Sequence, residues 1–227
     1  MRQAESLEVS RFKVLCLHGA GTNSDIFESQ TAALRYRLGL EEVQCDFVEG
    51  AHLWPAAPGI KETFGYHQNF YSYSDGTAQS VITAVNDLAE YVEDNGPFDA
   101  VMGFSLGAGL VATLLLRSGL KQTAIKSAIF LSACSPCDWG ALEQGRLRFL
   151  TAEDAVNIIG IPTVHSWSHL DTINPGQSEQ LLRICDKKTC TEVRHNAGHN
   201  VPNQVGEVGA LATAIKRMLA GLRSESD

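Results

Sequence analysis

The segment from residue 99 to residue 109 constrains the fold more than any other stretch of the chain. A short apolar run ends in Gly103-Phe104-Ser105-Leu106-Gly107 and continues into a second apolar run at residues 110–116. This pattern predicts a buried strand, a sharp turn and a helix, with the serine at the apex. The glycines on either side of the serine leave room for neighbouring backbone in such a turn. A glycine-rich turn before a core helix is the alternative, because a motif this short arises by chance in a chain with 20 glycines.

Elsewhere, apolar runs alternate with stretches of helical spacing. Runs that predict strands lie at residues 12–17, 43–48, 125–131, 161–167 and 189–194, in addition to the run before Ser105. Helical spacing predicts helices near residues 25–38, 77–95, 106–119, 178–184 and 204–222, the first with Asp25 and Glu28 as a capping box. Most of the strands are apolar throughout, as strands buried on both faces are. The sequence therefore predicts an α/β fold with a mostly parallel, six-stranded, doubly wound sheet.

Two irregular segments interrupt this alternation, at residues 50–76 and 134–160. The first has no sustained period and is rich in aromatic residues, among them Trp54, and the second contains Trp139. Stretches of this length inside a domain are commonly lids or binding loops, although a surface loop packed over the core is the alternative. We expect both to be lid-like insertions in a single domain that spans residues 1–227.

Composition and charge narrow the range of partners. Of the 227 residues, 44% are hydrophobic and 19% are charged, as in a globular protein. The net charge of −8 argues against a surface that binds nucleic acid or an anionic membrane. No apolar run approaches the ~20 residues of a membrane span. Residues 1–10 lack the apolar core of a secretory signal, so we expect a cytoplasmic protein whose six cysteines are reduced.

Two of the cysteines, Cys134 and Cys137, have C-x-x-C spacing. No second pair with zinc-site spacing accompanies them, and Cys185 with Cys190 fits such a site poorly. A pair of free structural thiols is therefore favoured over a redox pair. We expect neither a metal ion nor a cofactor.

A serine hydroxyl needs a base to become a nucleophile, and histidine is the usual base. Five of the seven histidines follow predicted strands at the edge where ligands of such sheets bind: His18, His52, His169, His195 and His199. His199 is favoured because it lies in a loop after the last strand and before the final helix. His195 is the alternative, but it directly follows strand residues and can simply end the strand.

An acid must hold the histidine in one tautomer. Asp171 follows the predicted strand at residues 161–167 and gives the chain order Ser105, Asp171, His199, which α/β-hydrolases share. Asp138, after the preceding strand, is the alternative. A single loop aspartate is more often a turn or cap residue, so the order of all three residues carries the prediction.

An oxyanion needs two N–H donors beside the serine. The backbone amide of Leu106, directly after the serine, is one candidate, and the amide of Ala20 in the loop after the first strand is the other, with Gly21 as an alternative. We expect His18 to shape this loop rather than to act as the base. The residues expected to line the substrate pocket are His18, Gly19, Trp54, Phe104 and Trp139.

Together these residues resemble a known family. The stretches Leu15-Cys16-Leu17-His18-Gly19, Gly103-Phe104-Ser105-Leu106-Gly107 and Gly198-His199-Asn200-Val201-Pro202, with Asp171 between them, resemble the small fungal serine hydrolases related to the human ovarian-tumour-suppressor-candidate esterase. The resemblance runs over residues 12–222. It implies an α/β-hydrolase with esterase or thioesterase activity and a catalytic triad of Ser105, Asp171 and His199.

The same resemblance suggests a substrate. Fungal members with Gly-Ala-Gly-Thr-Asn at positions 19 to 23 often belong to polyketide gene clusters, which implies release of an acyl chain from the acyl-carrier domain of a polyketide synthase. Family members usually have a bulkier residue in place of Ala20, so the acyl pocket near this loop is expected to differ.

Three alternatives stay open. One is a general carboxylesterase or lipid deacylase that acts on small or acyl esters with the same triad. Another is a non-catalytic α/β-hydrolase that binds a ligand, because fold does not fix function. The third is a structural partner of a larger synthase. Carrier proteins are generally acidic, so a docking face on this acidic chain must be locally basic, and the candidates are Arg35, Arg37, Arg146 and Arg148.

Overall fold

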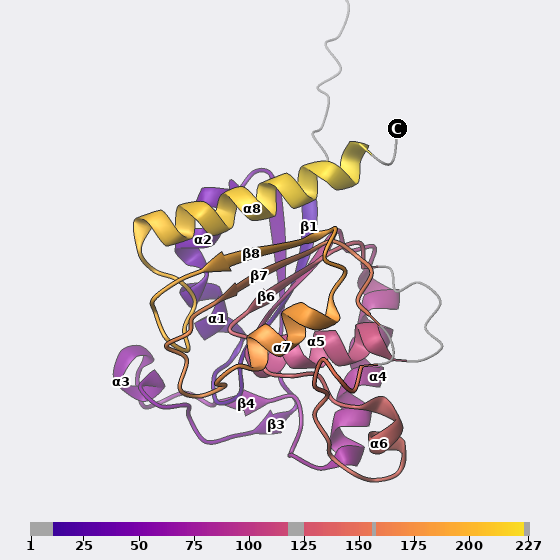
Figure 1. The fold of residues 1–227 in the computed structure, drawn as a ribbon. Helices are drawn as coiled ribbons and strands as arrows, with labels where there is room; N and C mark the ends of the chain where they lie inside the picture. Colours follow the sequence, from indigo (N-terminus) through magenta and orange to yellow (C-terminus); the bar gives the residue numbers. More distant parts are fainter. Residues whose placement is uncertain (1–10, 118–124, 156–157, 225–227) are drawn as a thin grey trace, which may run out of the picture.

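Six parallel strands form the central sheet of the protein (Figure 1). Their order in the sheet is β2 (Val43–Val48), β1 (Phe12–Leu17), β5 (Ala100–Phe104), β6 (Ala128–Leu131), β7 (Thr163–Trp167) and β8 (Cys190–Arg194). This computed structural model describes residues 11–117, 125–155 and 158–224. The terminal residues 1–10 and the predicted helix end at Gly119 lie outside that part. The predicted fold class, a doubly wound parallel sheet, is confirmed.

Two strands begin later than the apolar pattern predicts. β7 begins at Thr163 rather than at residue 161, because Pro162 has no N–H to donate to a ladder. β6 begins at Ala128 rather than at residue 125, and Ile125 forms only an isolated bridge with Phe98. Hydrophobicity alone thus extends a strand beyond its hydrogen-bonded part.

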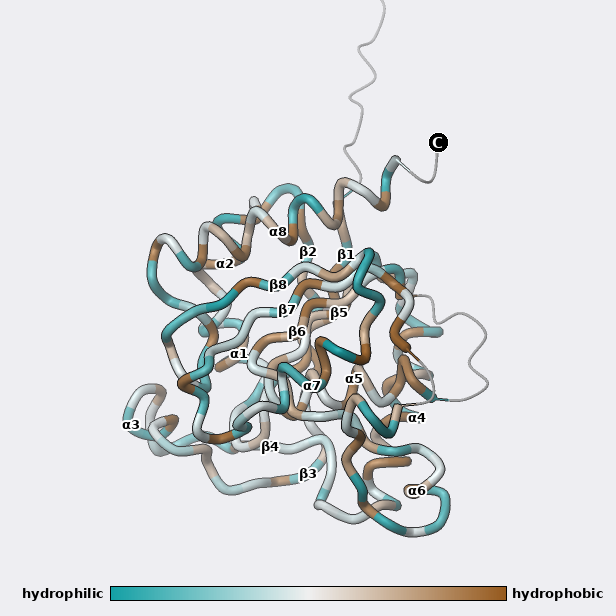
Figure 2. The backbone as a smooth tube through the Cα atoms, in the orientation of Figure 1, coloured by the Kyte–Doolittle hydropathy of each residue, from teal (hydrophilic) through white to brown (hydrophobic). Residues whose placement is uncertain are grey.

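Helices cover both faces of the sheet, and the alternation of side chains along β1 shows how. Val14 and Cys16 pack in one core under α1 (Ser24–Gln30), α2 (Ala32–Leu38) and α8 (Val205–Ser224). Leu15 and Leu17 pack in the other under α4 (Ala78–Asn95), α5 (Leu106–Leu116), α6 (Trp139–Glu143) and α7 (Gln177–Ile184). In Figure 2 hydrophobic residues follow the central strands and hydrophilic ones gather in the outer loops. Within the described residues, none of the helices has the length and hydrophobicity that a membrane span requires.

The predicted first helix is divided in two. Its N-cap is Asn23, whose side chain accepts a hydrogen bond from the amide of Ile26 at 2.8 Å, so the predicted capping box of Asp25 and Glu28 is wrong. The break falls at Thr31, whose hydroxyl donates to the carbonyl of Phe27 at 2.7 Å. A threonine bonded in this way competes with the helical hydrogen bonds of the backbone.

The segment at residues 50–76 has more structure than its sequence predicts. It contains β3 (His52–Leu53), α3 (Ile60–Phe64) and β4 (Tyr71–Ser72), with β3 antiparallel to β4. It is also bonded to the loop after β1: the amide of Gly21 donates to Tyr71, the amide of Tyr71 donates to Thr22, and the amide of Ala57 donates to Gly21, at 2.9, 2.7 and 2.9 Å. This segment is therefore anchored to the loop that follows β1.

The loop after β1 and the turn after β5 lie side by side, because β1 pairs with β5 in register from Val14 to Leu17. Gly107, in the first turn of α5, allows this approach. A Cβ at this position would lie 2.6 Å from the carbonyl oxygens of both Leu17 and His18. Ligands of open α/β sheets bind at the carboxyl ends of the strands where the strand order reverses, and here the order reverses between β1 and β5, beside Ser105.

We expect Gly107→Ala to destabilise the protein by about 1–3 kcal/mol, because the added methyl overlaps rigid backbone. Gly209→Ala in α8 is the matched control, since nothing lies within 4 Å of a Cβ there, and it should gain up to about 1 kcal/mol from helix propensity. Urea unfolding followed by circular dichroism measures both. Equal stabilities for the two variants would contradict the close approach of α5 to β1.

Candidate active site

Ser105 stands at the turn between β5 and α5 with a strained backbone. Its φ of 52° and ψ of −115° are unusual for a residue with a Cβ. Its amide donates to Leu131 at 3.0 Å, and its carbonyl accepts from Gly109 and Cys134 at 3.1 and 3.2 Å. Gly103 leaves room for the turn, because a Cβ there would lie 2.6 Å from the backbone of Ala108. Hydrogen bonds from three segments thus hold the strained serine in place.

The structure brings Ser105, His199 and Asp171 into one chain of hydrogen bonds. His199 Nε2 lies 2.9 Å from Ser105 Oγ, and His199 Nδ1 lies 2.7 Å from Asp171 Oδ2. A carboxylate only accepts, so Nδ1 carries the proton and Nε2 is left to accept the proton of the serine. This arrangement can deprotonate the hydroxyl as it attacks a carbonyl carbon.

The loop after β7 aims the carboxylate of Asp171. Its other oxygen, Oδ1, accepts hydrogen bonds from the amides of Ile173 and Asn174, both at 2.9 Å. Asp171 is buried, and the ring of Phe104 packs against that of His199 with 5.2 Å between the ring centres. The imidazole is therefore held by the carboxylate at one nitrogen and by an aromatic face.

The alternative residues lie in other environments. His195 is buried, its Nδ1 accepts from the amide of Ala197 at 3.2 Å, and burial lowers its pKa. Asp138 caps α6 and pairs with Arg148, whose hydrogen bond lowers the pKa of this carboxyl. Within the described residues neither side chain contacts Ser105.

A cleft of about 800 Å³ opens over Ser105 and His199. Of the residues predicted to line a pocket, Trp54 and Phe104 do so, but His18, Gly19 and Trp139 do not. The ring of His18 is fully buried against Glu49, and Gly19 lies against the ring of Phe104. The indole of Trp139 donates to Glu143 and stacks under the guanidinium of Arg117 instead.

Both predicted oxyanion donors belong to residues that line this cleft. Leu106 is the first residue of α5, so its amide has no acceptor one turn earlier in the helix. The amide of Ala20 donates no hydrogen bond within the described residues. The alternative donor Gly21 is already bonded to Tyr71, which removes it as a candidate.

Sequence reasoning missed several polar and apolar groups of the cleft. The side-chain amide of Asn174 lies 3.4 Å from Ser105 Oγ, and only its place three residues after Asp171 could have indicated it. Phe149 and Ile173 line the cleft from two different loops and are about half exposed, at 49% and 56%. Together with Trp54 they give the cleft an apolar mouth.

The cysteines near the cleft have the properties of structural thiols. Burial raises the pKa of Cys134 to about 12 and that of Cys137 to about 11, so both are protonated at neutral pH. All six cysteines are free. Among the residues that the structure describes, no group of three or more histidine, cysteine, aspartate or glutamate side chains could hold a metal ion.

Known proteins are similar to this chain in sequence and in fold. A family model described as Serine hydrolase (FSH1) matches residues 7–211. Esterase FPY3 of Fusarium mangiferae is 35% identical over 211 residues, which cover 91% of this chain and 96% of that protein. The carboxylesterase of Bacillus cereus superposes with a TM-score of 0.62 at 18% identity, covering 92% of this chain and 90% of that one. Acyl-protein thioesterase 2 of Zea mays gives 0.60 at 14%, covering 95% and 97%. These two structures establish the α/β-hydrolase fold.

The geometry predicts opposite outcomes for the two histidines. His199→Ala removes the group bonded to Ser105 and should lower kcat/KM for p-nitrophenyl acetate by roughly 1000-fold or more. His195→Ala should change it by less than about tenfold per folded molecule, because its ring contacts no reacting group. Steady-state hydrolysis, corrected for folded fraction by circular dichroism, measures both. Equal losses in the two variants would contradict the assignment of His199.

Proposed function

Because this chain belongs to the Serine hydrolase (FSH1) family, we propose that it cleaves a carboxylic ester or thioester through an acyl-enzyme on Ser105. One observation carries the proposal. The hydroxyl of Ser105 is hydrogen-bonded to His199, which is bonded to Asp171, and the serine faces a cleft large enough for a small-molecule acyl group.

The reaction has two halves. His199 Nε2 takes the proton of Ser105 Oγ while this oxygen bonds to the substrate carbonyl carbon, and Asp171 stabilises the imidazolium that forms. The amides of Leu106 and Ala20 donate to the resulting oxyanion. His199 then protonates the departing alkoxide or thiolate. In the second half, water attacks the acyl-enzyme with His199 again as base, which releases the acid and restores Ser105.

The mouth of the cleft favours an apolar acyl group. Trp54, Phe149 and Ile173 come from three separate segments, line the cleft and expose much of their side chains. Each buried methylene of a substrate is worth about 0.8 kcal/mol, so such a mouth binds long or aromatic acyl chains better than acetyl. We infer that the substrate carries an extended apolar acyl chain.

A more specific proposal concerns the leaving group of the substrate. We propose that it is the thiol arm of an acyl-carrier domain of a polyketide synthase, as the likeness to polyketide-cluster hydrolases suggests. Arg146 and Arg148 precede Phe149 at the cleft mouth, where they could meet an acidic carrier. Arg148 is already paired with Asp138 and Asp154, whereas the guanidinium of Arg146 bonds only the neutral side chain of Gln144 among the described residues. Arg146 is therefore a better candidate for docking than Arg148. It is also preferred to Arg35 and Arg37, because these lie on α2, which does not line the cleft.

Carrier-bound acyl thioesters and p-nitrophenyl esters of the same acyl chain distinguish this role from that of a general carboxylesterase. A carrier-directed enzyme should show a kcat/KM at least about tenfold higher for the carrier thioester, and Arg146→Glu should remove that preference. Equal values of kcat/KM for the two substrates would favour the general esterase.

We also propose that residues 1–227 form one α/β-hydrolase domain that acts in the cytoplasm.

Ser105→Ala should abolish covalent labelling by a fluorophosphonate probe, because the nucleophile is gone. Ser127→Ala is the control: the hydroxyl of this buried serine donates to the carbonyl of Asp99 at 2.8 Å, at the opposite end of the strands. That variant should label like the wild type. Intact-protein mass spectrometry measures the adduct. Labelling of the Ser105→Ala protein would show that the nucleophile is wrong, and an unlabelled wild type would favour a non-catalytic binding protein.

Phe149→Ala should raise KM for p-nitrophenyl decanoate by about tenfold, because the chain loses an apolar wall, and leave KM for the acetate within about twofold. Tyr36→Ala is the control, since Tyr36 is 76% exposed on α2 and does not line the cleft. Initial rates across a series of chain lengths give the comparison. A shift that is uniform along the series would show that Phe149 does not contact the acyl chain.

A further inference from the structure

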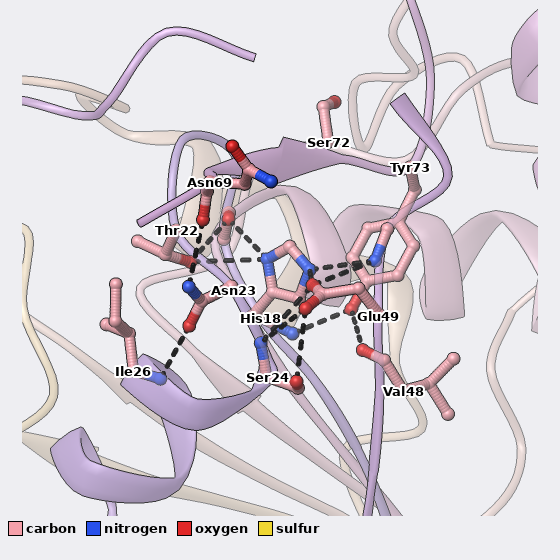
Figure 3. Close-up of polar contacts among 12 residues, drawn as sticks. His18, Thr22, Asn23, Ser24, Ile26, Val48, Glu49, Asn69, Ser72 and Tyr73 are labelled. Carbon is pink, nitrogen blue, oxygen red and sulfur yellow. Dashed lines mark hydrogen bonds and ion pairs between the residues drawn. The ribbon is translucent and has the colours of Figure 1, made fainter. Parts of the chain in front are cut away.

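The peptide bond between Gly19 and Ala20 is held from one side by two donors. The carbonyl oxygen of Gly19 lies 2.7 Å from Nδ1 of His18 and 2.7 Å from the hydroxyl of Thr22. Figure 3 shows His18 and Thr22 side by side, joined by a dashed line. Both donors are buried. A carbonyl with two buried donors is unusually well fixed, because it can leave them only by abandoning two desolvated groups.

Fixing this carbonyl also fixes the amide on the other side of the same peptide. The Gly19–Ala20 peptide is trans, so its C=O and N–H point in opposite directions. With the oxygen directed toward His18 and Thr22, the N–H of Ala20 is directed away from them. Ala20 lines the cleft beside Ser105, and a Cβ on Gly19 would lie only 3.3 Å from the Cβ of Ser105. The N–H of Ala20 is thereby directed to the side where an oxyanion on Ser105 would form.

The ring of His18 is itself held on every side. Its Nε2 lies 2.9 Å from Glu49 Oε1 and 3.0 Å from the amide of Gly50. The ring of Tyr73 packs against it at 4.7 Å, and the hydroxyl of Tyr73 bridges the amide of His18 to the carbonyl of Val48 (Figure 3). Since the carbonyl of Gly19 can only accept, a hydrogen bond between it and Nδ1 assigns a proton to Nδ1.

The loop needs this restraint because Gly19 permits rotation of the peptide that follows it. Rotation of the Gly19–Ala20 peptide changes ψ of Gly19 and φ of Ala20. Gly19 has no Cβ, so its ψ is less restricted than that of other residues. A flipped Gly19–Ala20 peptide would present its carbonyl oxygen to the cleft, where it would repel a developing oxyanion instead of donating to it.

We propose that His18 and Thr22 are positioning residues that hold the Gly19 carbonyl so that the amide of Ala20 serves the oxyanion. This inference rests on the proposed function, since it assigns the amide of Ala20 a part in that reaction. Thr22 also lines the cleft, but among the described residues neither side chain is hydrogen-bonded to Ser105, His199 or Asp171. The two residues lower the free energy of the transition state rather than that of the bound substrate, because the negative charge on the oxygen develops only in the transition state.

Thr22→Val tests the proposal by removing one donor while keeping the shape of the side chain. We expect kcat for p-nitrophenyl butyrate to fall about tenfold with KM unchanged within about twofold, below the roughly 100-fold to 1000-fold cost of losing an oxyanion donor outright. The Ki of a trifluoromethyl ketone, which forms a tetrahedral oxyanion on the serine, should rise by the same factor. Thr22→Ser, which restores the hydroxyl, should recover both values.

Thr31→Val is the matched control. Thr31 is equally buried and its hydroxyl also donates to a backbone carbonyl at 2.7 Å, that of Phe27, but it lies between α1 and α2. It should lose similar stability and keep the wild-type kcat and Ki. Titration of reactive serine with a fluorophosphonate gives the concentration of competent enzyme in each preparation.

The outcomes separate this inference from the proposed function. If wild-type enzyme hydrolyses the ester and Thr22→Val matches Thr31→Val in kcat and Ki, the positioning role is overturned and the function stands. A fall in kcat without a rise in Ki, or a loss that Thr22→Ser does not recover, also overturns it. If the wild type neither labels nor hydrolyses, the proposed function fails, and the assignment of Ala20 with it.

Discussion

The approach of Gly107 to the carbonyl oxygens of Leu17 and His18 is the contact on which the site depends. It allows α5 to pack against the end of β1, which is next to β5, the strand that α5 follows in the chain. The strained turn at Ser105 and the loop after β1 then share one edge of the sheet. A single methyl group at this contact would push the first turn of α5 away from the loop, and Ser105 and the amide of Leu106 would move with it.

Parallel pairing supplies the remaining parts of the site. β7 and β8 run in the same direction as β5, so the loops that follow them leave the sheet at the edge where Ser105 stands. Asp171 comes from the first loop and His199 from the second. The amides of Ile173 and Asn174 hold one carboxylate oxygen and leave the other for the imidazole. His199 is 28 positions from Asp171 and 94 positions from Ser105 in the sequence, and the parallel sheet brings all three within hydrogen-bonding distance.

The sequence predicted those features of the fold and of the site that follow from local periodicity and from chain order. The sheet and the order of Ser105, Asp171 and His199 follow from apolar runs and from the loops after them. The antiparallel pair of β3 and β4 could not be predicted, because strands of two residues have no detectable period. The burial of His18 depends on Glu49, a partner 31 residues away, and the apolar mouth depends on Phe149 and Ile173, which only tertiary packing brings together. Trp139 was misplaced because its indole lies under the guanidinium of Arg117, which is distant in sequence, and donates to Glu143 at the end of α6.

The bonds between residues 50–76 and the loop after β1 have an evolutionary consequence. Residues 54–58 form one wall of the cleft, and the same segment donates to Gly21 through Ala57 and pairs with Thr22 through Tyr71. If the cleft binds the acyl group as proposed, a substitution on this wall that admits a new acyl group also disturbs the loop that carries Ala20, so selectivity and turnover change together. The wall formed by Phe149 and Ile173 has no such bond to residues 18–22 among the described residues. The effect of a substitution at Phe149 or Ile173 therefore depends less on the loop at residues 18–22. Related enzymes of different selectivity should differ at these two positions first.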